Sequence, residues 1–163
     1  HQITDTNDRC EMVKLAIAEY PYFGFSDFEI SRTGNTYTAQ TLQLLKEAYP
    51  EHTFYFIVGA DSLYHIETWY HPELVLGHVT ILAARRECDD AACSLEKQAD
   101  YLKSKYGAAI FLLHSAAMHI SSQELRERQS NGTGIHDLVP DSVERYIREH
   151  GLYQHPDRRK DTL

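Results

Sequence analysis

Three short apolar runs stand out in the pattern of hydrophobic and polar positions along the chain. They cover residues 53–60 (TFYFIVGA), 78–86 (HVTILAARR) and 108–115 (AAIFLLHS). Nearly continuous apolar runs of this length are typical of strands that are buried on both faces, as in a parallel sheet. We therefore predict three parallel strands.

A further strand is predicted over residues 23–31, where apolar and polar positions alternate in part. Phe23 and Phe25 would face one side of this strand, and Phe28 and Ile30 the other. Alternation with a period of two is the pattern of a strand with one buried face.

Apolar residues that recur every three or four positions predict helices before and between the strands. The first helix covers residues 4–20, and either Asp5 or Thr6 can cap its start. One face of this helix carries four apolar residues, Met12, Leu15, Ala16 and Tyr20.

A second helix is predicted over residues 36–49, with Leu42, Leu45 and Tyr49 on its buried face and Pro50 at its end. Five more helices follow: a short one after Ala60, then residues 72–76, 93–106, 119–132 and 140–150. Strands that alternate with helices indicate a doubly wound α/β sheet, in which ligands bind at the carboxyl ends of the strands. We predict one domain over residues 1–153 and a polar tail or linker over residues 154–163.

Composition narrows the class of protein. The 163 residues include 24 acidic and 16 basic ones, for a net charge of −8. This acidic balance argues against nucleic acid as a partner, since nucleic-acid binders usually carry a basic stripe. No apolar run approaches the roughly 20 residues of a membrane span. Three cysteines without a framework indicate reduced thiols, so we expect a cytoplasmic protein that does not bind a membrane.

The segment HISSQELRERQSNG, residues 119–132, combines a helix start with two arginines. Ser121 and Glu124 fit a capping box, in which each side chain covers a free backbone amide. The same helix start could instead hold a phosphate. Arg126 lies on the same helix face as Ser122, and its guanidinium could then close over that phosphate. Both interpretations stand at this point, and Arg128 is expected to be a solvated surface charge.

Two candidate sites follow the first buried strand. Gly59 would allow a ligand to approach closely, and Asp61 could accept hydrogen bonds from ribose hydroxyls or simply cap the next helix. Trp69 and Tyr70 could stack on a flat heteroaromatic ring or could fill the edge of the core.

Two further features have a structural and a functional interpretation. Thr36 or Thr38 could cap the second helix, or the amides there could bind a carboxylate. The pair Arg85–Arg86 ends a predicted strand and could contact an anion or be solvated. The histidines show no metal-ligand spacing, so we predict no protein-bound metal.

Five motifs together resemble the bacterial nicotinate mononucleotide adenylyltransferases. These motifs are residues 36–38 (TYT), 59–63 (GADSL), 68–70 (TWY), 120–126 (ISSQELR) and 146–153 (YIREHGLY). The ISSxxLR element is common to several adenylyltransferases, whereas the TYT and WY elements are more specific. The resemblance runs over residues 8–153 and implies a Rossmann-like fold of the nucleotidyltransferase superfamily.

The resemblance also implies what these residues bind. The expected ATP ligands are Gly59, Asp61, Ser121, Ser122 and Arg126, with Arg126 stabilising phosphate charge. The expected nicotinate-nucleotide ligands are Thr38, Trp69, Tyr70 and Arg86. The implied reaction joins nicotinate mononucleotide to ATP and gives deamido-NAD and pyrophosphate, with Mg²⁺ bound to the ATP polyphosphate. A homo-oligomer is compatible with this function.

The sequence departs from this family at its start. Family members open with a strand and a GGxFDPxHxGH loop, whose histidines contact the ATP phosphates. The present sequence has no such segment, so its catalytic residues stay unknown and the piece alone is expected to be inactive or weakly active. Two alternatives therefore stand: another adenylyltransferase, such as the pantetheine phosphate type, or a non-catalytic nucleotide-binding domain.

Overall fold

The computed structural model describes residues 4–32, 34–84, 92–113 and 120–154. Contacts along the chain divide it into two compact units. One comprises His1–Ser31 with His119–Leu163, and the other comprises Arg32–Met118. The two are described separately below, and the single domain predicted over residues 1–153 stays a prediction. None of the helices in the described ranges has the length and apolar character that crossing a membrane requires.

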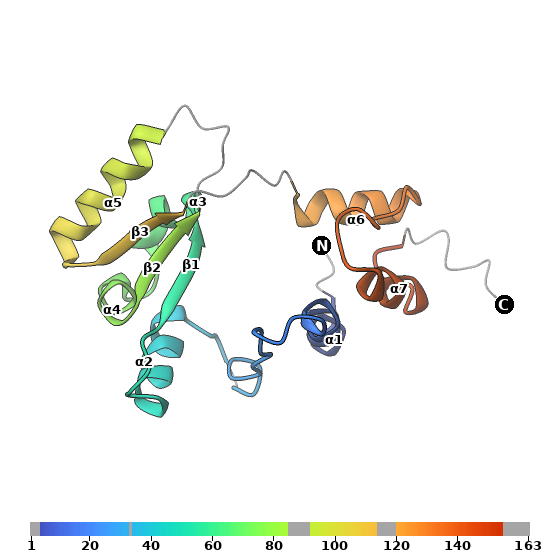
Figure 1. Ribbon diagram of the computed structural model, residues 1–163, viewed down its shortest axis with the longest axis horizontal. Helices are drawn as coiled ribbons and strands as arrows, with labels where there is room; N and C mark the ends of the chain where they lie inside the picture. The colour runs from blue at the N-terminus through green and yellow to red at the C-terminus, as the bar shows by residue number, and fades with distance from the viewer. Residues whose placement is uncertain (1–3, 33, 85–91, 114–119, 155–163) are drawn as a thin grey trace. The chain divides into compact units, whose positions relative to one another are not determined.

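The unit Arg32–Met118 contains a three-stranded parallel sheet (Figure 1). Its strands are β1 (Tyr55–Gly59), β2 (Thr80–Ala84) and β3 (Ala109–Leu113), in that spatial order. The strands are in register, so that Gly59, Ala84 and Leu113 end them at the same edge. The three predicted strands and their parallel direction are confirmed, although the second begins at Thr80 because His78 still belongs to the preceding helix.

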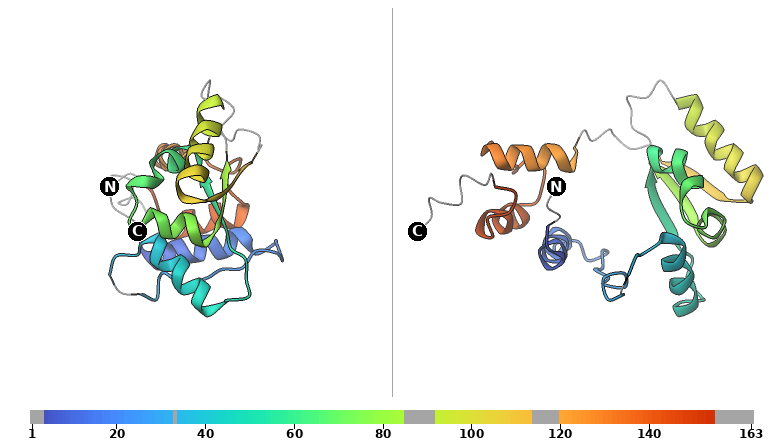
Figure 2. Two further views of the ribbon diagram at one scale, coloured as in Figure 1. Left: turned by 90° about the vertical axis from the view of Figure 1, so that its left-hand side faces the viewer. Right: turned by 180° about the vertical axis from the view of Figure 1, so that it is seen from behind.

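Helices of this unit alternate with its strands. They are α2 (Thr38–Ala48), α3 (Ala60–His65), the 3₁₀ turn η1 (Ile66–Thr68), α4 (Pro72–His78) and α5 (Ala92–Tyr106). Helix α3 packs on β1 and β2, α5 packs on β3, and α2 packs on α4 (Figures 1 and 2). Their contacts form one core, whose fully buried members include Leu63, Ile66, Val75, Ile81 and Leu102.

The two faces of the sheet differ within this unit. Val58, Ile81 and Ile110 point to the helices and are buried, whereas Ile57 and Phe111 on the other face are 67% and 61% exposed. Both crossovers step in the same direction along the sheet. Since such connections are right-handed, they place their helices on one face. The apolar runs had predicted strands that are buried on both faces. Within this unit, taken by itself, the strands are not buried on both faces.

Helix α2 is shorter than predicted. It begins at Thr38 and not at Thr36, and it ends at Ala48. Ala39 and Leu42 are buried as expected for its inner face, but Tyr49 is 46% exposed. Tyr49 has left the helical conformation, with φ −134° and ψ 66°, so its ring no longer continues the buried stripe.

The other unit contains α1 (Thr6–Ile17), α6 (Ser122–Asn131) and α7 (Asp141–Glu149). A small core of Ile135, Val143 and Ile147 packs against apolar residues of α1 and α6, including Met12 and Leu125. The Tyr146 hydroxyl donates to Asp8 at 2.9 Å, and Asp5 caps α1 by accepting from the Asn7 amide at 2.8 Å. The predicted first helix is thus confirmed, but it stops before Tyr20, which is 44% exposed.

The strand predicted over residues 23–31 is wrong. This segment forms turns, in which the amides of Ile30 and Ser31 donate to the carbonyl of Asp27. The Ser26 hydroxyl also accepts from the Phe28 amide at 3.3 Å. Ser and Asp side chains and backbones favour such local bonds over strand pairing, and they outweigh a partial alternation of apolar residues.

Candidate active site

Two segments far apart in the sequence meet around one small cavity. The cavity has a volume of about 210 Å³ and is lined by Thr36, Tyr37, Thr38, Trp69 and Tyr70. The first three residues lead into α2, and the last two follow η1. The structure therefore brings together the TYT and WY elements, which the sequence had singled out separately.

The start of α2 leaves its backbone amides uncapped. Tyr37 occupies the N-cap position, and no side chain in the described ranges makes a capping hydrogen bond there. The first amides of a helix have no partner within the helix, and together with the helix dipole they favour a negative charge. The structural alternative, in which Thr36 or Thr38 caps this helix, is therefore wrong.

Trp69 forms the inner wall of the cavity. Its amide donates to the carbonyl of Ile66 at 3.1 Å and ends the η1 turn. The indole packs on the core at an angle of 67° to Phe56, with 6.3 Å between ring centroids. The interpretation that this ring fills the edge of the core is confirmed. The same ring lines the cavity, and its stacking on the ring of a ligand stays a prediction. Tyr70 is more exposed and lies on the outer side.

A cluster around Glu67 holds the η1 turn against α5, and the sequence did not predict it. The Glu67 carboxylate accepts from Lys105 Nζ at 2.7 Å, from the Tyr106 hydroxyl at 2.9 Å and from the Tyr101 hydroxyl at 3.3 Å. The hydrogen bond from Lys105 is the main cause that lowers the pKa of Glu67, followed by that from Tyr106. The same contacts raise the pKa of Lys105 and of Tyr106.

Arg32 is a second residue that the sequence did not predict. Its guanidinium donates to the Thr41 hydroxyl at 3.3 Å and to the Gln40 side chain at 3.4 Å. Both acceptors lie in the first turns of α2, so Arg32 places a positive charge near the uncapped end of this helix. An arginine six residues before the helix was the only sequence signal for it.

Gly59 and Asp61 lie at the carboxyl end of the sheet, as predicted for ligand contacts. Gly59 ends β1 and is the N-cap residue of α3, and a Cβ atom added there would meet nothing within 4 Å. Asp61 lies in the first turn of α3 and is exposed. Since the N-cap position belongs to Gly59, the alternative that Asp61 caps this helix is wrong. Arg86 lies outside the described residues.

The start of α6 belongs to the other unit, and its Ser cap is present. The Ser121 hydroxyl accepts from the Glu124 amide at 3.0 Å. The Glu124 carboxylate does not complete a capping box, because it accepts from Arg128 at 2.8 Å instead. Arg128 also donates to Asp137 at 3.1 Å. Arg128 is therefore ion-paired rather than a free surface charge.

Arg126 differs from Arg128 in its surroundings. Its guanidinium lies over the ring of Tyr153, 5.9 Å from the centroid. In the described ranges it has no carboxylate partner, and both Arg126 and Ser122 are exposed. Of the two arginines, Arg126 is thus the one whose charge is available to an anion.

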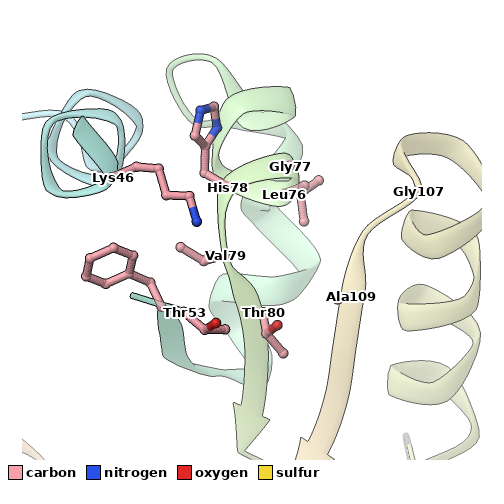
Figure 3. Close-up of a pocket in the computed structure, with 10 residues that line it drawn as sticks. Lys46, Thr53, Leu76, Gly77, His78, Val79, Thr80, Gly107 and Ala109 are labelled. Carbon is pink, nitrogen blue, oxygen red and sulfur yellow. The ribbon is translucent and has the colours of Figure 1, made fainter. Parts of the chain in front are cut away.

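A second cavity lies at the opposite, amino end of the strands (Figure 3). Its volume is about 220 Å³, and Lys46, Thr53, His78 and Thr80 are among its lining residues. The Lys46 ammonium donates to the His52 carbonyl at 3.3 Å. No predicted site residue is among the described residues that line it. The two cavities are nearly equal in size, so size does not distinguish them. They differ in the residues that line them.

Comparison with known proteins places this chain in a family. A model of the cytidylyltransferase-like family matches residues 1–128. A probable nicotinate-nucleotide adenylyltransferase of Lachnoclostridium phytofermentans is 42% identical over 152 residues, which cover 93% of this chain and 76% of the relative. A probable nicotinate-nucleotide adenylyltransferase of Caldicellulosiruptor bescii is 37% identical over the same shares of the two chains.

Solved structures agree on the fold. The nicotinic acid mononucleotide adenylyltransferase of Plasmodium falciparum complexed with APC superposes with a TM-score of 0.72 at 24% identity, over 94% of this chain and 78% of that one. The complex of that protein with NaAD gives a TM-score of 0.73 at 22% identity, over 94% and 76% of the two chains.

The fold, the cavity and these matches define the class of protein: the chain belongs to the cytidylyltransferase-like family of nucleotidyltransferases. Within that family it belongs to the nicotinate-nucleotide adenylyltransferases, as the resemblance of its sequence motifs to that family had implied.

Proposed function

We propose that the cavity between α2 and Trp69 is where this enzyme holds the pyridine ring of its substrate. The enzyme transfers the adenylyl group of ATP to nicotinate mononucleotide, in the biosynthesis of NAD. The observation that carries the proposal is an uncapped helix start beside an aromatic wall in one cavity. These two features match the two parts of nicotinate, a flat ring and a carboxylate.

The α2 amides are proposed to bind the carboxylate. Thr38 begins the helix, so its amide and that of Ala39 lie where a helix start attracts an anion. The guanidinium of Arg32 adds positive charge near the same turns. A neutral carboxamide gains less from this field, so the pocket would prefer nicotinate to nicotinamide. Trp69 and Tyr70 would stack on the ring.

ATP contacts are proposed within each unit, and the two sets are considered separately. Ser121, Ser122 and Arg126 would hold the phosphates, with the start of α6 supplying amides and Arg126 a charge. Gly59 and Asp61 would lie near the adenosine ribose, where the carboxylate accepts from hydroxyls. Arg86 is proposed instead as a contact of the nicotinate nucleotide, at its phosphate. The support for Arg126 is that, within the described ranges, its guanidinium lies over the Tyr153 ring and has no carboxylate partner, in contrast to the ion-paired Arg128.

In the reaction, a phosphate oxygen of the mononucleotide attacks the α-phosphorus of ATP. One P–O bond forms and the bond to the pyrophosphate leaving group breaks. The residues named here would position the two phosphates and stabilise charge, which is the main contribution of proteins to such transfers. Mg²⁺ is proposed to enter the site bound to the ATP polyphosphate, which offers the oxygen ligands that this ion prefers. In the described part of the chain, no three His, Cys, Asp or Glu side chains are grouped to hold an ion.

Some properties stay predictions. We expect a cytoplasmic enzyme with reduced cysteines, a single domain over residues 1–153 followed by a polar tail, and no binding to nucleic acid or membrane. A homo-oligomer is compatible with the proposed activity. Sedimentation of the purified enzyme would measure its oligomeric state.

Pyrophosphate release tests the proposed substrate. The enzyme is incubated with ATP, Mg²⁺ and one of three acceptors: nicotinate mononucleotide, nicotinamide mononucleotide or pantetheine phosphate. We expect release to be fastest with nicotinate mononucleotide and product to be deamido-NAD. Faster release with pantetheine phosphate would support the other adenylyltransferase type. Saturable binding without release, in a chain that carries the histidine loop of the family, would support a non-catalytic domain.

A further inference from the structure

Tyr153 has a backbone conformation that tyrosine rarely adopts. It lies in the unit of α1, α6 and α7, where α7 is followed by Gly151 with φ 58° and, two residues later, by Tyr153 with φ 60°. A positive φ is ordinary for glycine, whereas it is uncommon for a residue with a Cβ atom. Such a conformation costs free energy and persists only where the surrounding structure holds it. The contacts of Tyr153 must therefore offset this cost.

Several contacts hold the Tyr153 side chain in place. The side chain packs against the small core of this unit. The Thr4 hydroxyl, from the segment before α1, donates to the Tyr153 hydroxyl at 3.1 Å. The guanidinium of Arg126 lies over the ring, 5.9 Å from its centroid. The segment after α7 is thus fixed so that its ring faces an arginine of α6.

An aromatic ring holds a guanidinium in a different way from a carboxylate. Arg128 donates to Glu124 and to Asp137, so its N–H groups are occupied and its charge is offset. The face of a ring attracts a cation through its quadrupole and does not accept from the N–H groups as a carboxylate does. Arg126 is exposed and, among the described residues, has no carboxylate partner. Its donors are therefore available to phosphate oxygens.

The ring can also restrain Arg126 before an anion binds. A long arginine side chain samples many rotamers, and fixing them on a ligand costs conformational entropy. A contact that limits these rotamers in the free protein reduces that cost. The Tyr153 ring can do this because the core and Thr4 fix the ring itself. It limits the motion of the guanidinium and leaves its charge intact.

We infer that Tyr153 is a positioning residue for adenylyl transfer: its ring orients the guanidinium of Arg126 toward the ATP phosphates without neutralising it. The inference rests on the proposed function, because Arg126 is the phosphate contact proposed there. It gives a role to the last of the five sequence motifs, residues 146–153, to which the proposed function assigns none. It also accounts for a tyrosine at a position whose backbone alone would favour glycine.

A double-mutant cycle tests the inference on a chain that carries the histidine loop of the family. The value of kcat/KM for ATP is measured for Tyr153→Leu, for Arg126→Ala and for the two together. Tyr153→Leu should lower it about two- to fivefold, which corresponds to the loss of one exposed cation–π contact. In the Arg126→Ala background the same substitution should have no further effect, because the guanidinium is gone.

Three further variants separate the effect of the ring from that of the fold. Tyr153→Phe keeps the ring and loses the contact with Thr4, so it should recover the parent value. Tyr153→Asn removes the ring but tolerates the left-handed backbone, so it should show the loss even if Tyr153→Leu folds poorly. Tyr146→Leu is the matched control, since the Tyr146 ring stacks on His150 and its hydroxyl donates to Asp8 in the same unit. It should lower the melting temperature and leave kcat/KM for ATP unchanged.

The outcomes separate the inference from the proposed function. If Arg126→Ala leaves kcat/KM for ATP unchanged, the proposed phosphate contact is wrong and the role of Tyr153 is wrong with it. If Arg126→Ala lowers this value but the Tyr153 substitutions do not, only the role of Tyr153 is wrong. The same holds if they lower it by an equal factor with and without Arg126. A loss in Tyr146→Leu as large as that in Tyr153→Leu would likewise overturn the inference.

Discussion

Two helix starts carry the proposed chemistry, and they are built in opposite ways. At α2 the N-cap residue is Tyr37, which makes no side-chain cap, and the surrounding residues are aromatic. At α6 the N-cap residue is Ser121, which caps the Glu124 amide, and the surrounding residues are charged. The first helix start leaves its own amides open, whereas the second satisfies one of them and supplies a separate cation, Arg126.

This difference fits two kinds of anion. A carboxylate is small and is attached to a flat ring, so open amides beside an aromatic wall can bind it. A polyphosphate carries more charge and more oxygens, and a guanidinium gives it paired, charge-assisted hydrogen bonds. The comparison teaches that a capping residue does not by itself decide whether a helix start is structural or functional. The groups beside it must be included.

The largest effect is expected at the charged helix start. Replacing Arg126 by alanine should weaken the use of ATP by about 1.5–3 kcal/mol, the range for a hydrogen bond to a charged group. The measurement is kcat/KM for ATP at saturating mononucleotide. Arg128→Ala is the matched control on the same helix, because its guanidinium is ion-paired with Glu124 and Asp137. Equal losses in both variants would remove the distinction between the two arginines.

The next effect is expected at the aromatic helix start. Trp69→Ala should raise KM for nicotinate mononucleotide about tenfold, which corresponds to the loss of one aromatic stacking contact. KM for ATP should change much less. Because Trp69 also packs on Phe56, thermal unfolding must be followed to confirm that the variant is folded. An effect confined to ATP would mean that the two pockets have been assigned the wrong way round.

A smaller effect is expected from the cap of α6. Ser121→Ala removes the acceptor for the Glu124 amide and should lower the free energy of unfolding by about 1 kcal/mol. If the amides of this helix start also bind phosphate, KM for ATP should rise in the same variant. Denaturant unfolding and steady-state kinetics measure the two effects separately. A loss of stability with unchanged kinetics would make Ser121 a cap only.

The smallest effect is expected at Glu67, which anchors the turn before Trp69. The lowered pKa of Glu67 means that its carboxylate stabilises the fold at pH values above the ordinary value of 4.5. That stabilisation is lost as the pH falls through the lowered pKa of the folded state. Glu67→Gln should therefore melt at a lower temperature than the parent chain at pH 7, with the difference shrinking below pH 4. A difference that is constant with pH would contradict this account.

The sequence predicted the elements whose pattern is long or strongly apolar. The three parallel strands were found because each is a compact apolar run, and α1 because its apolar face repeats over several turns. The strand over residues 23–31 failed because Ser26 and Asp27 form local turns, which a period-two count does not weigh. The exposure of Tyr49 depends on where α2 ends, and helix ends are the least predictable feature.

The same contrast holds for the candidate site. Trp69, Tyr70 and Thr38 could be named from sequence because their motifs are distinctive. Arg32 and Glu67 could not, since their roles come from contacts over 8 to 39 positions with side chains of ordinary type. The absent cap at Tyr37 was also invisible, because the sequence offered threonines on both sides as capping residues. Only the observed helix boundary decides between them.

The central claim is that the uncapped start of α2 and the indole of Trp69 form a pocket that distinguishes a carboxylate from a carboxamide. Trp69 is the only tryptophan, so its fluorescence reports on this one place. The most direct measurement is a titration of the chain with deamido-NAD and, in parallel, with NAD. The account predicts quenching that saturates at lower concentrations of deamido-NAD than of NAD. Equal responses, or a preference for NAD, would contradict it.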